Sequence, residues 1–243
     1  MSFGQSASLF NQVRRDYYTS ELIEIVAGIL AAMSGQRLID VGCGTGISTR
    51  QLAACGFDVA GTDLDVDMIE EASSLGKAAG YFVMSADRLQ FPDESFHGAT
   101  AFSAFHWFCD DSSVREIRRV LQTGSRFVVV KKSDCGPFRE RIVEIVRRYV
   151  TLTLDKHTAG YYPVEVLKKG GFHDIQERTL TSIERLPVET AVSFVRTMRF
   201  WEEVPQLFHA SIDEALRGYV TSQLNEAGYF LRPITTTIIY GRK

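Results

Sequence analysis

Apolar residues follow two alternating patterns through the first half of the chain. Short apolar runs at 37–41, 57–62, 81–84, 99–102 and 127–130 are bounded by glycine or polar residues, which is typical of buried strands. Between these runs, apolar residues recur every three or four positions, which predicts amphipathic helices at 22–33, 47–55, 68–75 and 114–121. Strands that alternate with helices at these lengths indicate a parallel sheet with both faces covered.

The second half keeps the helical spacing but has fewer strand signals. We expect helices at 138–149, 188–200 and 212–224, and strands at 180–183 and 234–240. Several polar residues are suited to cap helices: Asp65 or Asp67, Asp111 and Ser112, and the capping box from Ser211 to Glu214. No low-complexity linker divides the chain. We therefore predict a single domain over residues 1–243, with cap helices inserted within about 133–228.

Composition narrows the functional classes. The chain has 243 residues, is 45% hydrophobic and carries 27 basic against 30 acidic residues, a net charge of −3. A globular protein is expected, and a nucleic-acid partner is not, because no basic excess is present. The N-terminus lacks a secretory pattern, and no apolar stretch is long enough for a bilayer, so we expect a cytoplasmic protein without a membrane partner. No pair of the four cysteines has metal-ligand spacing, so we expect no metal.

A glycine-rich turn carries the first functional signal. Asp40, Gly42, Cys43, Gly44 and Gly46 lie between a predicted strand and a predicted helix. Glycines let the backbone turn tightly and let a ligand approach closely. This turn opens at the carboxyl end of the strand, where open α/β sheets bind ligands.

An acidic residue at the end of the next strand extends this signal. Asp63 could accept hydrogen bonds from both hydroxyls of a ribose, so the turn and this residue together predict an adenosine-containing cofactor. The alternative is a structural turn with a solvated carboxylate nearby. The spacing G-x-G-x-G differs from the dinucleotide pattern G-x-G-x-x-G. Asp40 beside the turn would repel a diphosphate and attract an ammonium group, which favours an amino-acid cofactor over NAD.

The segment from Leu38 to Gly46 resembles the first motif of class I S-adenosylmethionine-dependent methyltransferases. Further family motifs are similar to residues 61–65, 85–92, 96–108 and 118–126, in the family's order. The resemblance implies a Rossmann-like, doubly wound α/β sheet of about seven strands, mostly parallel, with an antiparallel last strand at 234–240 and a helical cap. It also implies S-adenosyl-L-methionine as the cofactor.

Residue roles follow from the same resemblance. It implies that Asp63 binds the ribose, that Leu64 packs on the adenine and that Asp87 accepts the adenine amino group. The other positions that it assigns to the cofactor are Ala86, Arg88, Ala101 and Phe102, together with Asp40, Gly42, Cys43, Gly44 and Gly46. Two departures from the family pattern are His97, where members often have Asp, and Ser125, where a second glycine is usual.

Some of these residues have a structural alternative. Asp87 could cap the following turn through its side chain. Leu64, Leu89 and Phe91 could belong to the core instead of the adenine site.

Two shorter segments resemble methyltransferases related to trans-aconitate methyltransferase. These are Ala104–Phe108, read A-F-H-W-F, and Leu9–Tyr18, which lacks the usual proline. Arg14 could neutralise the cofactor carboxylate and Tyr17 could close the site. A surface arginine and a packing tyrosine are the alternatives.

The expected reaction is methyl transfer to a small-molecule acceptor, with a carboxylate as one candidate. A carboxylate needs no deprotonation before it accepts the methyl group. His106 is the candidate general base and, with Trp107 and Trp201, a candidate substrate contact; packing beside Trp107 is the alternative for His106. We expect the helix at 188–207, which carries Trp201, to roof the acceptor site, with an ordinary core helix as the alternative. The lone histidines, at 157, 173 and 209, are expected at the surface.

The arginines of the predicted helices could bind an acidic substrate, or they could be solvated; these are Arg139, Arg141, Arg147, Arg148, Arg196 and Arg199. Other functions stay possible on sequence alone. They are a nucleic-acid methyltransferase, an NAD-dependent oxidoreductase and a non-catalytic protein that binds S-adenosylmethionine.

Overall fold

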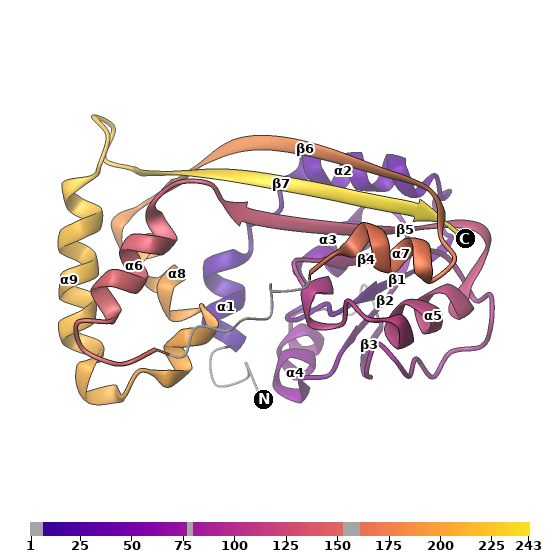
Figure 1. Cartoon of the computed structure of the whole chain (residues 1–243), viewed down its shortest axis with the longest axis horizontal. Helices are drawn as coiled ribbons and strands as arrows, with labels where there is room; N and C mark the ends of the chain where they lie inside the picture. The colour runs from indigo at the N-terminus through magenta and orange to yellow at the C-terminus, as the bar shows by residue number, and fades with distance from the viewer. Residues whose placement is uncertain (1–6, 77–79, 153–160) are drawn as a thin grey trace. The chain divides into compact units, whose positions relative to one another are not determined.

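The apolar runs of the sequence form strands of one seven-stranded sheet in the computed structural model, which describes residues 7–76, 80–152 and 161–243 (Figure 1). The strand order is β3-β2-β1-β4-β5-β7-β6. The strands are β1 (Arg37–Val41), β2 (Asp58–Asp63), β3 (Gly80–Val83), β4 (Phe96–Phe102), β5 (Leu121–Asp134), β6 (His173–Leu186) and β7 (Phe230–Arg242).

The first five strands are parallel, as the alternation of strands and helices predicts. The strand order reverses beside β1, whose two neighbours are β2 and β4, and such a switch point is where open α/β sheets bind ligands. The turn that follows β1 therefore lies at the position that this topology favours for a site.

The last strand runs antiparallel to both of its neighbours. Gly124 of β5 donates a backbone hydrogen bond to Lys243, the residue after β7, and Cys135, the residue after β5, donates one to Pro233 of β7. The residue number along β7 therefore falls as the residue number along β5 rises. Against β6, Tyr240 contacts Gln176 and Arg232 contacts Glu184, which gives the same descending register. The predicted antiparallel last strand and the Rossmann-like fold class are confirmed.

The chain divides into two compact units. The first unit comprises Met1–Lys131, His157–Arg178 and Thr237–Lys243, and the second comprises Lys132–Lys156 and Thr179–Thr236. Strands β5, β6 and β7 each contribute residues to both units. That the whole chain folds as one domain stays a prediction.

In the first unit, alternate residues of the strands face two helical layers. Leu38 of β1 packs in a cluster with α2 (Ser20–Leu30) and α3 (Ile47–Ala54). Ile39, the next residue, packs in a cluster with α5 (Asp111–Val120) and α7 (Pro163–Lys169). Both side chains are fully buried, as expected for a sheet that is covered on each face. Among its described residues, this unit also contains α1 (Ala7–Arg14), α4 (Val66–Ser74) and η2 (Phe105–Trp107).

The second unit has its own aromatic and charged interior. The ring of Phe138 lies 6.5 Å from that of Phe194 and 5.1 Å from that of Phe230. Arg232 is 2% exposed, lies over the ring of Phe194 at 4.0 Å, and donates to Glu184 at 2.8 Å. The described part of this unit contains the helices α6 (Phe138–Val146), α8 (Val188–Arg196), η3 (Arg199–Glu203), η4 (Gln206–Phe208) and α9 (His209–Ser222).

Several predicted boundaries are wrong. Asp110, not Asp111 or Ser112, caps α5 by accepting the backbone N–H groups of Ser112 and Ser113. Leu121, predicted on the face of that helix, is instead the first residue of β5. Asp65 does cap α4, one of the two positions predicted for it.

The helix α9 also begins earlier than predicted. It starts at His209, and its N-cap residue, Phe208, makes no side-chain hydrogen bond to the helix. The capping box from Ser211 to Glu214 therefore does not form the helix start. The helix predicted over 188–200 ends at Arg196 and is followed by the separate 3-10 helix η3. Helices α1 and α7 have no predicted counterpart. Among the helices described, none is both long enough and apolar enough to cross a lipid bilayer.

Candidate functional site

The glycine-rich turn after β1 is tied to the end of β2 by its backbone. The N–H groups of Gly42 and Cys43 both donate to the carbonyl of Thr62, at 2.7 and 2.9 Å. Gly44 then donates to Oδ2 of Asp63 at 2.8 Å. The turn and the acidic residue that we predicted 19 positions later are thus in direct contact.

The three glycines of this turn have φ angles of +70°, +53° and +74°, in the left-handed region that side chains rarely adopt. Two of them also have close neighbours. A Cβ on Gly42 would lie 2.6 Å from Cβ of Ala104, and one on Gly46 would lie 2.5 Å from the Tyr81 hydroxyl oxygen. A Cβ on Gly44 would meet no protein atom within 4 Å. The backbone at Gly44 is therefore open on the side where a ligand could approach.

Tyr81 is a residue of this site that sequence reasoning missed. Its ring also lies against Gly61 of β2, where a Cβ would come within 2.9 Å of it. Two glycines on neighbouring elements thus accommodate one aromatic ring. The only sequence signal was an aromatic residue in a short strand, which does not specify a packing partner.

Asp40 lies beneath the turn with its side chain fully buried. Its Oδ2 accepts hydrogen bonds from the hydroxyls of Ser48 and Thr49 at 2.7 and 2.8 Å, and its Oδ1 accepts one from Thr100 at 2.8 Å. Burial raises the pKa of this carboxyl group, and the three hydroxyls oppose the increase. These contacts favour a role in shaping the turn. The ammonium contact that we expected of Asp40 stays a prediction.

Asp63 lies nearer the surface and holds the turn from its other side. Besides Gly44, it accepts the backbone N–H of Asp65 at 3.0 Å through Oδ1. Burial raises its pKa, against the effect of these backbone donors. Each carboxylate oxygen keeps a further lone pair for a hydroxyl donor. Leu64 beside it is 70% exposed, so the alternative that Leu64 is a core residue is wrong.

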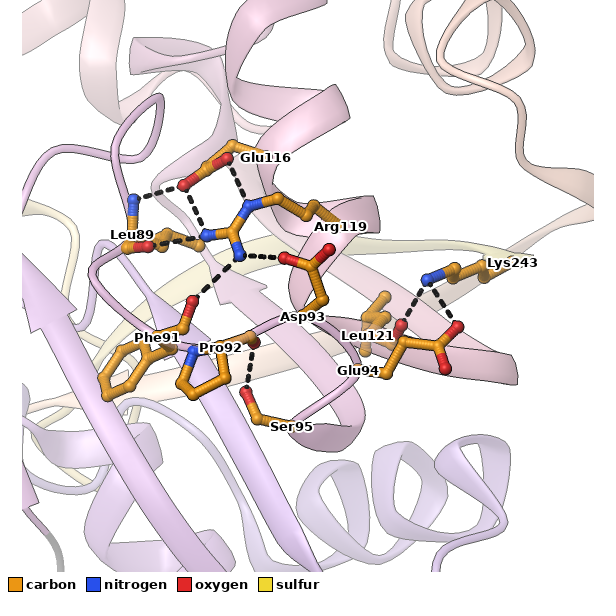
Figure 2. A network of polar contacts seen from close by, with 10 residues as sticks. All are labelled: Leu89, Phe91, Pro92, Asp93, Glu94, Ser95, Glu116, Arg119, Leu121 and Lys243. Atoms are coloured by element: carbon orange, nitrogen blue, oxygen red, sulfur yellow. Dashed lines mark hydrogen bonds and ion pairs between the residues drawn. The ribbon is translucent and has the colours of Figure 1, made fainter.

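The loop that follows β3 carries the third predicted motif and is anchored by one arginine (Figure 2). Arg119 of α5 donates to the carbonyls of Leu89 and Phe91, at 2.7 and 2.9 Å, and to Asp93 at 2.6 Å. Glu116 accepts from the same guanidinium at 2.8 and 2.9 Å and also accepts the backbone N–H of Leu89. This cluster fixes the backbone of the loop two residues after Asp87.

Within this loop the predicted residues separate into two groups. Asp87 and Arg88 are exposed, and the Ser85 hydroxyl donates to Oδ1 of Asp87. No backbone N–H of the described residues is seen to donate to Asp87, so these contacts do not favour the capping alternative. Leu89 is 2% exposed and Phe91 packs against the core, which supports the core interpretation for both. Ala86 also packs against the core.

The end of β4 brings the fourth motif beside the turn. Ala101 and Phe102 are core residues, 0% and 5% exposed, which does not favour side-chain contact with a ligand. The chain then leaves the sheet at Ser103, which has a φ of +51° and donates its N–H to the carbonyl of Val130 at 2.7 Å. Ala104 follows and lies against Gly42. The segment after β4 is therefore fixed between the turn and Val130 of β5.

An aromatic cluster with one ammonium group lies on this segment. The rings of His106 and Trp107 are 4.7 Å apart, and the ring of Tyr161 lies 6.4 Å from that of His106. Nζ of Lys131, the residue after Val130, lies over the Tyr161 ring at 4.6 Å. Trp107 is 40% exposed. Sequence reasoning missed Lys131 and Tyr161, because Tyr161 lies far along the chain and no motif contains either residue.

The N-terminal segment is also attached to the turn. Arg50 of α3 donates to the carbonyl of Thr45 at 2.7 Å and to the Asn11 side chain at 2.9 Å, which links α1 to the turn. Arg14 at the end of α1 lies over the ring of Tyr17 at 5.3 Å. The structure thus brings both predicted N-terminal residues into the first unit beside α3. Their cofactor roles stay predictions.

The candidates of the second unit lie in other surroundings. Trp201 is 8% exposed, with its ring 4.9 Å from that of His209. His209 is partly exposed, and its Nε2 also contacts the Val204 carbonyl at 3.0 Å. Of the other lone histidines, His173 of the first unit is exposed, as expected, and His157 lies outside the described residues.

The predicted arginines of the second unit also divide. Arg196 pairs with Asp213, whereas four arginines in or next to α6 have solvated side chains: Arg139, Arg141, Arg147 and Arg148. The substrate role of Trp201 and the roof predicted over 188–207 stay predictions.

Comparison with known proteins places this geometry in a family. A family model described as a methyltransferase domain matches residues 39–129, which include the turn, Asp63 and the anchored loop. An uncharacterized methyltransferase of Schizosaccharomyces pombe, C70.08c, is 31% identical over 183 residues, 66% of this chain and 68% of that protein. The malonyl-[acyl-carrier protein] O-methyltransferase of Erwinia billingiae is 26% identical and is matched over 74% of this chain and 70% of its own length.

A solved structure agrees in fold. It is the phosphoethanolamine N-methyltransferase 2 of Haemonchus contortus, solved with phosphomonomethylethanolamine and S-adenosylhomocysteine. The match covers all of this chain and 60% of the Haemonchus chain. Its TM-score is 0.52 at 19% identity. The matched motifs, the seven-stranded order and the relative in S. pombe agree with one another, and the chain belongs to the methyltransferase family with the class I, Rossmann-like fold.

Proposed function

We propose that this chain transfers a methyl group from S-adenosylmethionine to a small-molecule acceptor, and that the accepting group is a carboxylate. The observation that carries the cofactor assignment is the open backbone at Gly44, beside the half-buried Asp63 and the exposed Leu64. A carboxylate, an apolar side chain and an accessible backbone fit a ribose, an adenine and an amino-acid portion. The related fold solved with S-adenosylhomocysteine supports the same cofactor.

Residues of the turn and of the neighbouring loops would each hold one part of this cofactor. Asp63 would accept hydrogen bonds from the ribose hydroxyls, and Leu64 would cover one face of the adenine. Asp87 would accept the adenine amino group from the loop that Arg119 anchors. Asp40 would keep the turn in shape from beneath. When bound, S-adenosylmethionine supplies a methyl group activated by its sulfonium.

The acceptor side would lie on the segment after β4. A carboxylate attacks without losing a proton, so this reaction requires positioning and exclusion of water more than a general base. His106 would then orient or contact the acceptor, as its ring contacts with Trp107 and Tyr161 permit. The relative whose name gives O-methyl transfer to malonyl-[acyl-carrier protein] supports an acidic acceptor, because a malonyl group carries a free carboxylate.

A transfer assay with methyl-labelled S-adenosylmethionine tests this proposal. The panel would pair small carboxylic acids with the corresponding alcohols and amines, and would include an RNA and a DNA duplex. We expect label to enter one or more acids and neither nucleic acid. Binding of S-adenosylmethionine without transfer to any compound would favour a non-catalytic binding protein. Transfer to nucleic acid alone would contradict the small-molecule assignment.

A further inference from the structure

We propose that Lys131 and Tyr161 form the anion subsite of the acceptor site, and that this subsite binds a carboxylate attached to an apolar or aromatic body. The inference rests on the proposed function, which it deepens by naming the residue that recognises the acid. Nothing in the sequence motifs assigns either residue.

The first argument is position. Val130, the residue before Lys131, accepts the backbone N–H of Ser103 at 2.7 Å. Ala104, the residue after Ser103, lies against the Gly42 turn. Lys131 therefore lies within β5, directly after Val130, the last β5 residue that pairs with β4. This position is on the same edge of the sheet as the turn, next to the residue that holds the acceptor segment. A ligand group at Lys131 would lie on the acceptor side of the proposed cofactor site.

The second argument is charge. Lys131 is half-buried, and no carboxylate of the described residues lies within 4.0 Å of its Nζ. The Lys131 Nζ lies over the face of the Tyr161 ring, 4.6 Å from the ring centroid. A cation–π contact orients an ammonium group but leaves its hydrogen-bond donors available, because the ring supplies no oxygen acceptor along its face. The neighbouring Lys132 differs, since it donates to Glu184 at 2.6 Å.

The third argument is the surrounding surface. The Tyr161 ring is mostly buried, and this burial raises its pKa, so the phenol stays neutral and does not compete for the ammonium group. The rings of His106 and Phe105 lie 6.4 and 6.3 Å from it. Phe105 is a core residue, 1% exposed, whereas the rings of His106, Tyr161 and the 40% exposed Trp107 make an aromatic wall beside the Lys131 ammonium group. Such a combination suits a carboxylic acid with an apolar or planar body more than a sugar or a polyphosphate.

Binding measurements on small acids and their amides test this subsite. The protein, saturated with S-adenosylhomocysteine, would be titrated with benzoate, phenylacetate and hexanoate, and with benzamide, phenylacetamide and hexanamide, by calorimetry or ligand-observed NMR. We expect at least one acid to bind about tenfold more tightly than its amide, the gain of one charge-assisted hydrogen bond. Lys131→Met should remove this preference without weakening the amides, and Lys131→Arg should keep most of it.

Lys168→Met is the matched control, because Lys168 is an exposed lysine of α7 in the same unit. It should leave the preference for acids unchanged. Equal binding of acids and amides to the unsubstituted protein, or a preference that survives in Lys131→Met, would overturn the subsite. Failure of S-adenosylhomocysteine to bind would instead overturn the proposed function, and the same acid titrations on the protein alone would still decide the role of Lys131.

Discussion

The glycine-rich turn and the interior of the second unit bury charged groups in different ways. Beneath the turn, Asp40 is surrounded by three neutral hydroxyls, from α3 and β4. In the second unit, Arg232 is buried with acidic partners on other strands and with aromatic rings. The hydroxyls around Asp40 hold its carboxyl group in a fixed place without an opposite charge. Around Arg232, opposite charges are paired across strands.

This difference separates the residues that shape a ligand site from those that stabilise a fold. The partners of Asp40 come from the helix and strand that border the turn, so they fix local backbone geometry. Arg232, Glu184 and Lys132 join β7, β6 and β5, whose residues are far apart in the chain. Substitutions in the turn should therefore alter ligand binding, and substitutions in the ion cluster should alter stability.

The largest expected effect is on stability, from Arg232→Met. Removing one partner of a buried ion pair leaves an uncompensated charge and costs about 3–5 kcal/mol. We expect a decrease of this size in the free energy of unfolding, measured with urea. The control is Arg217→Met, which breaks the solvent-exposed pair with Glu189 and should cost much less. Equal losses in the two variants would contradict the stabilising role of the cluster.

Asp63→Ala should produce the next largest effect, on cofactor affinity. Loss of a charged hydrogen-bond partner costs about 1.5–3 kcal/mol, or roughly ten- to a hundredfold in Kd. Calorimetry with S-adenosylhomocysteine measures this change. Asp58→Ala, at the start of the same strand in an exposed pair with Arg37, should bind as the unsubstituted protein does. Unchanged affinity in Asp63→Ala would remove this residue from the site.

A smaller effect is expected from Arg119→Met, which releases the loop that carries Asp87. Weaker positioning of one hydrogen bond costs about 1 kcal/mol, or roughly fivefold in affinity for S-adenosylhomocysteine. The preference for S-adenosylhomocysteine over S-inosylhomocysteine should also decrease, because only the former has the amino group. The adjacent Arg118→Met, whose side chain contacts Gly171, is the control. A fivefold loss with undiminished preference would show that the anchor is structural only.

The smallest effect is the pH dependence of binding. Burial raises the pKa of Asp63, so this group is protonated at a higher pH than an ordinary Asp. Protonation removes charge and one acceptor site, so affinity for S-adenosylhomocysteine should decrease as the pH falls from about 7 towards 4. The same raised pKa means that Asp63 favours the folded state more at low pH and less as the pH rises through it. A profile in Asp63→Asn as steep as in the unsubstituted protein would exclude this residue as the cause.

The turn could be predicted because its geometry restricts the residue type. Positive φ angles favour glycine, and the close approach of Ala104 to Gly42 excludes a side chain. Asp63 could be placed beside the turn because β1 and β2 are parallel neighbours, whose carboxyl ends lie at the same edge of the sheet. The same rules identified β1 with its observed bounds and the Asp65 cap.

Other features could not be predicted because several patterns fit the same residues. Leu121 continues the apolar spacing of α5, yet it pairs with Phe96 before a register shift and so begins β5. Strand β6 is largely exposed, so most of it lacks the apolar alternation by which a strand is recognised. The partners of Arg232, Arg119 and Lys131 depend on contacts between distant segments, for which a single sequence carries no local signal.

One titration tests most directly whether the turn after β1 is the cofactor site. S-adenosylhomocysteine and NAD would be titrated into the unsubstituted protein, Gly44→Val and Gly35→Val, with circular dichroism as the measure of folding. Gly35 is a matched control, because it also has a positive φ and open space around its Cβ position. We predict that S-adenosylhomocysteine, and not NAD, binds to the unsubstituted protein and to Gly35→Val, and that folded Gly44→Val binds neither. Undiminished binding of S-adenosylhomocysteine to folded Gly44→Val would contradict the assignment of the turn.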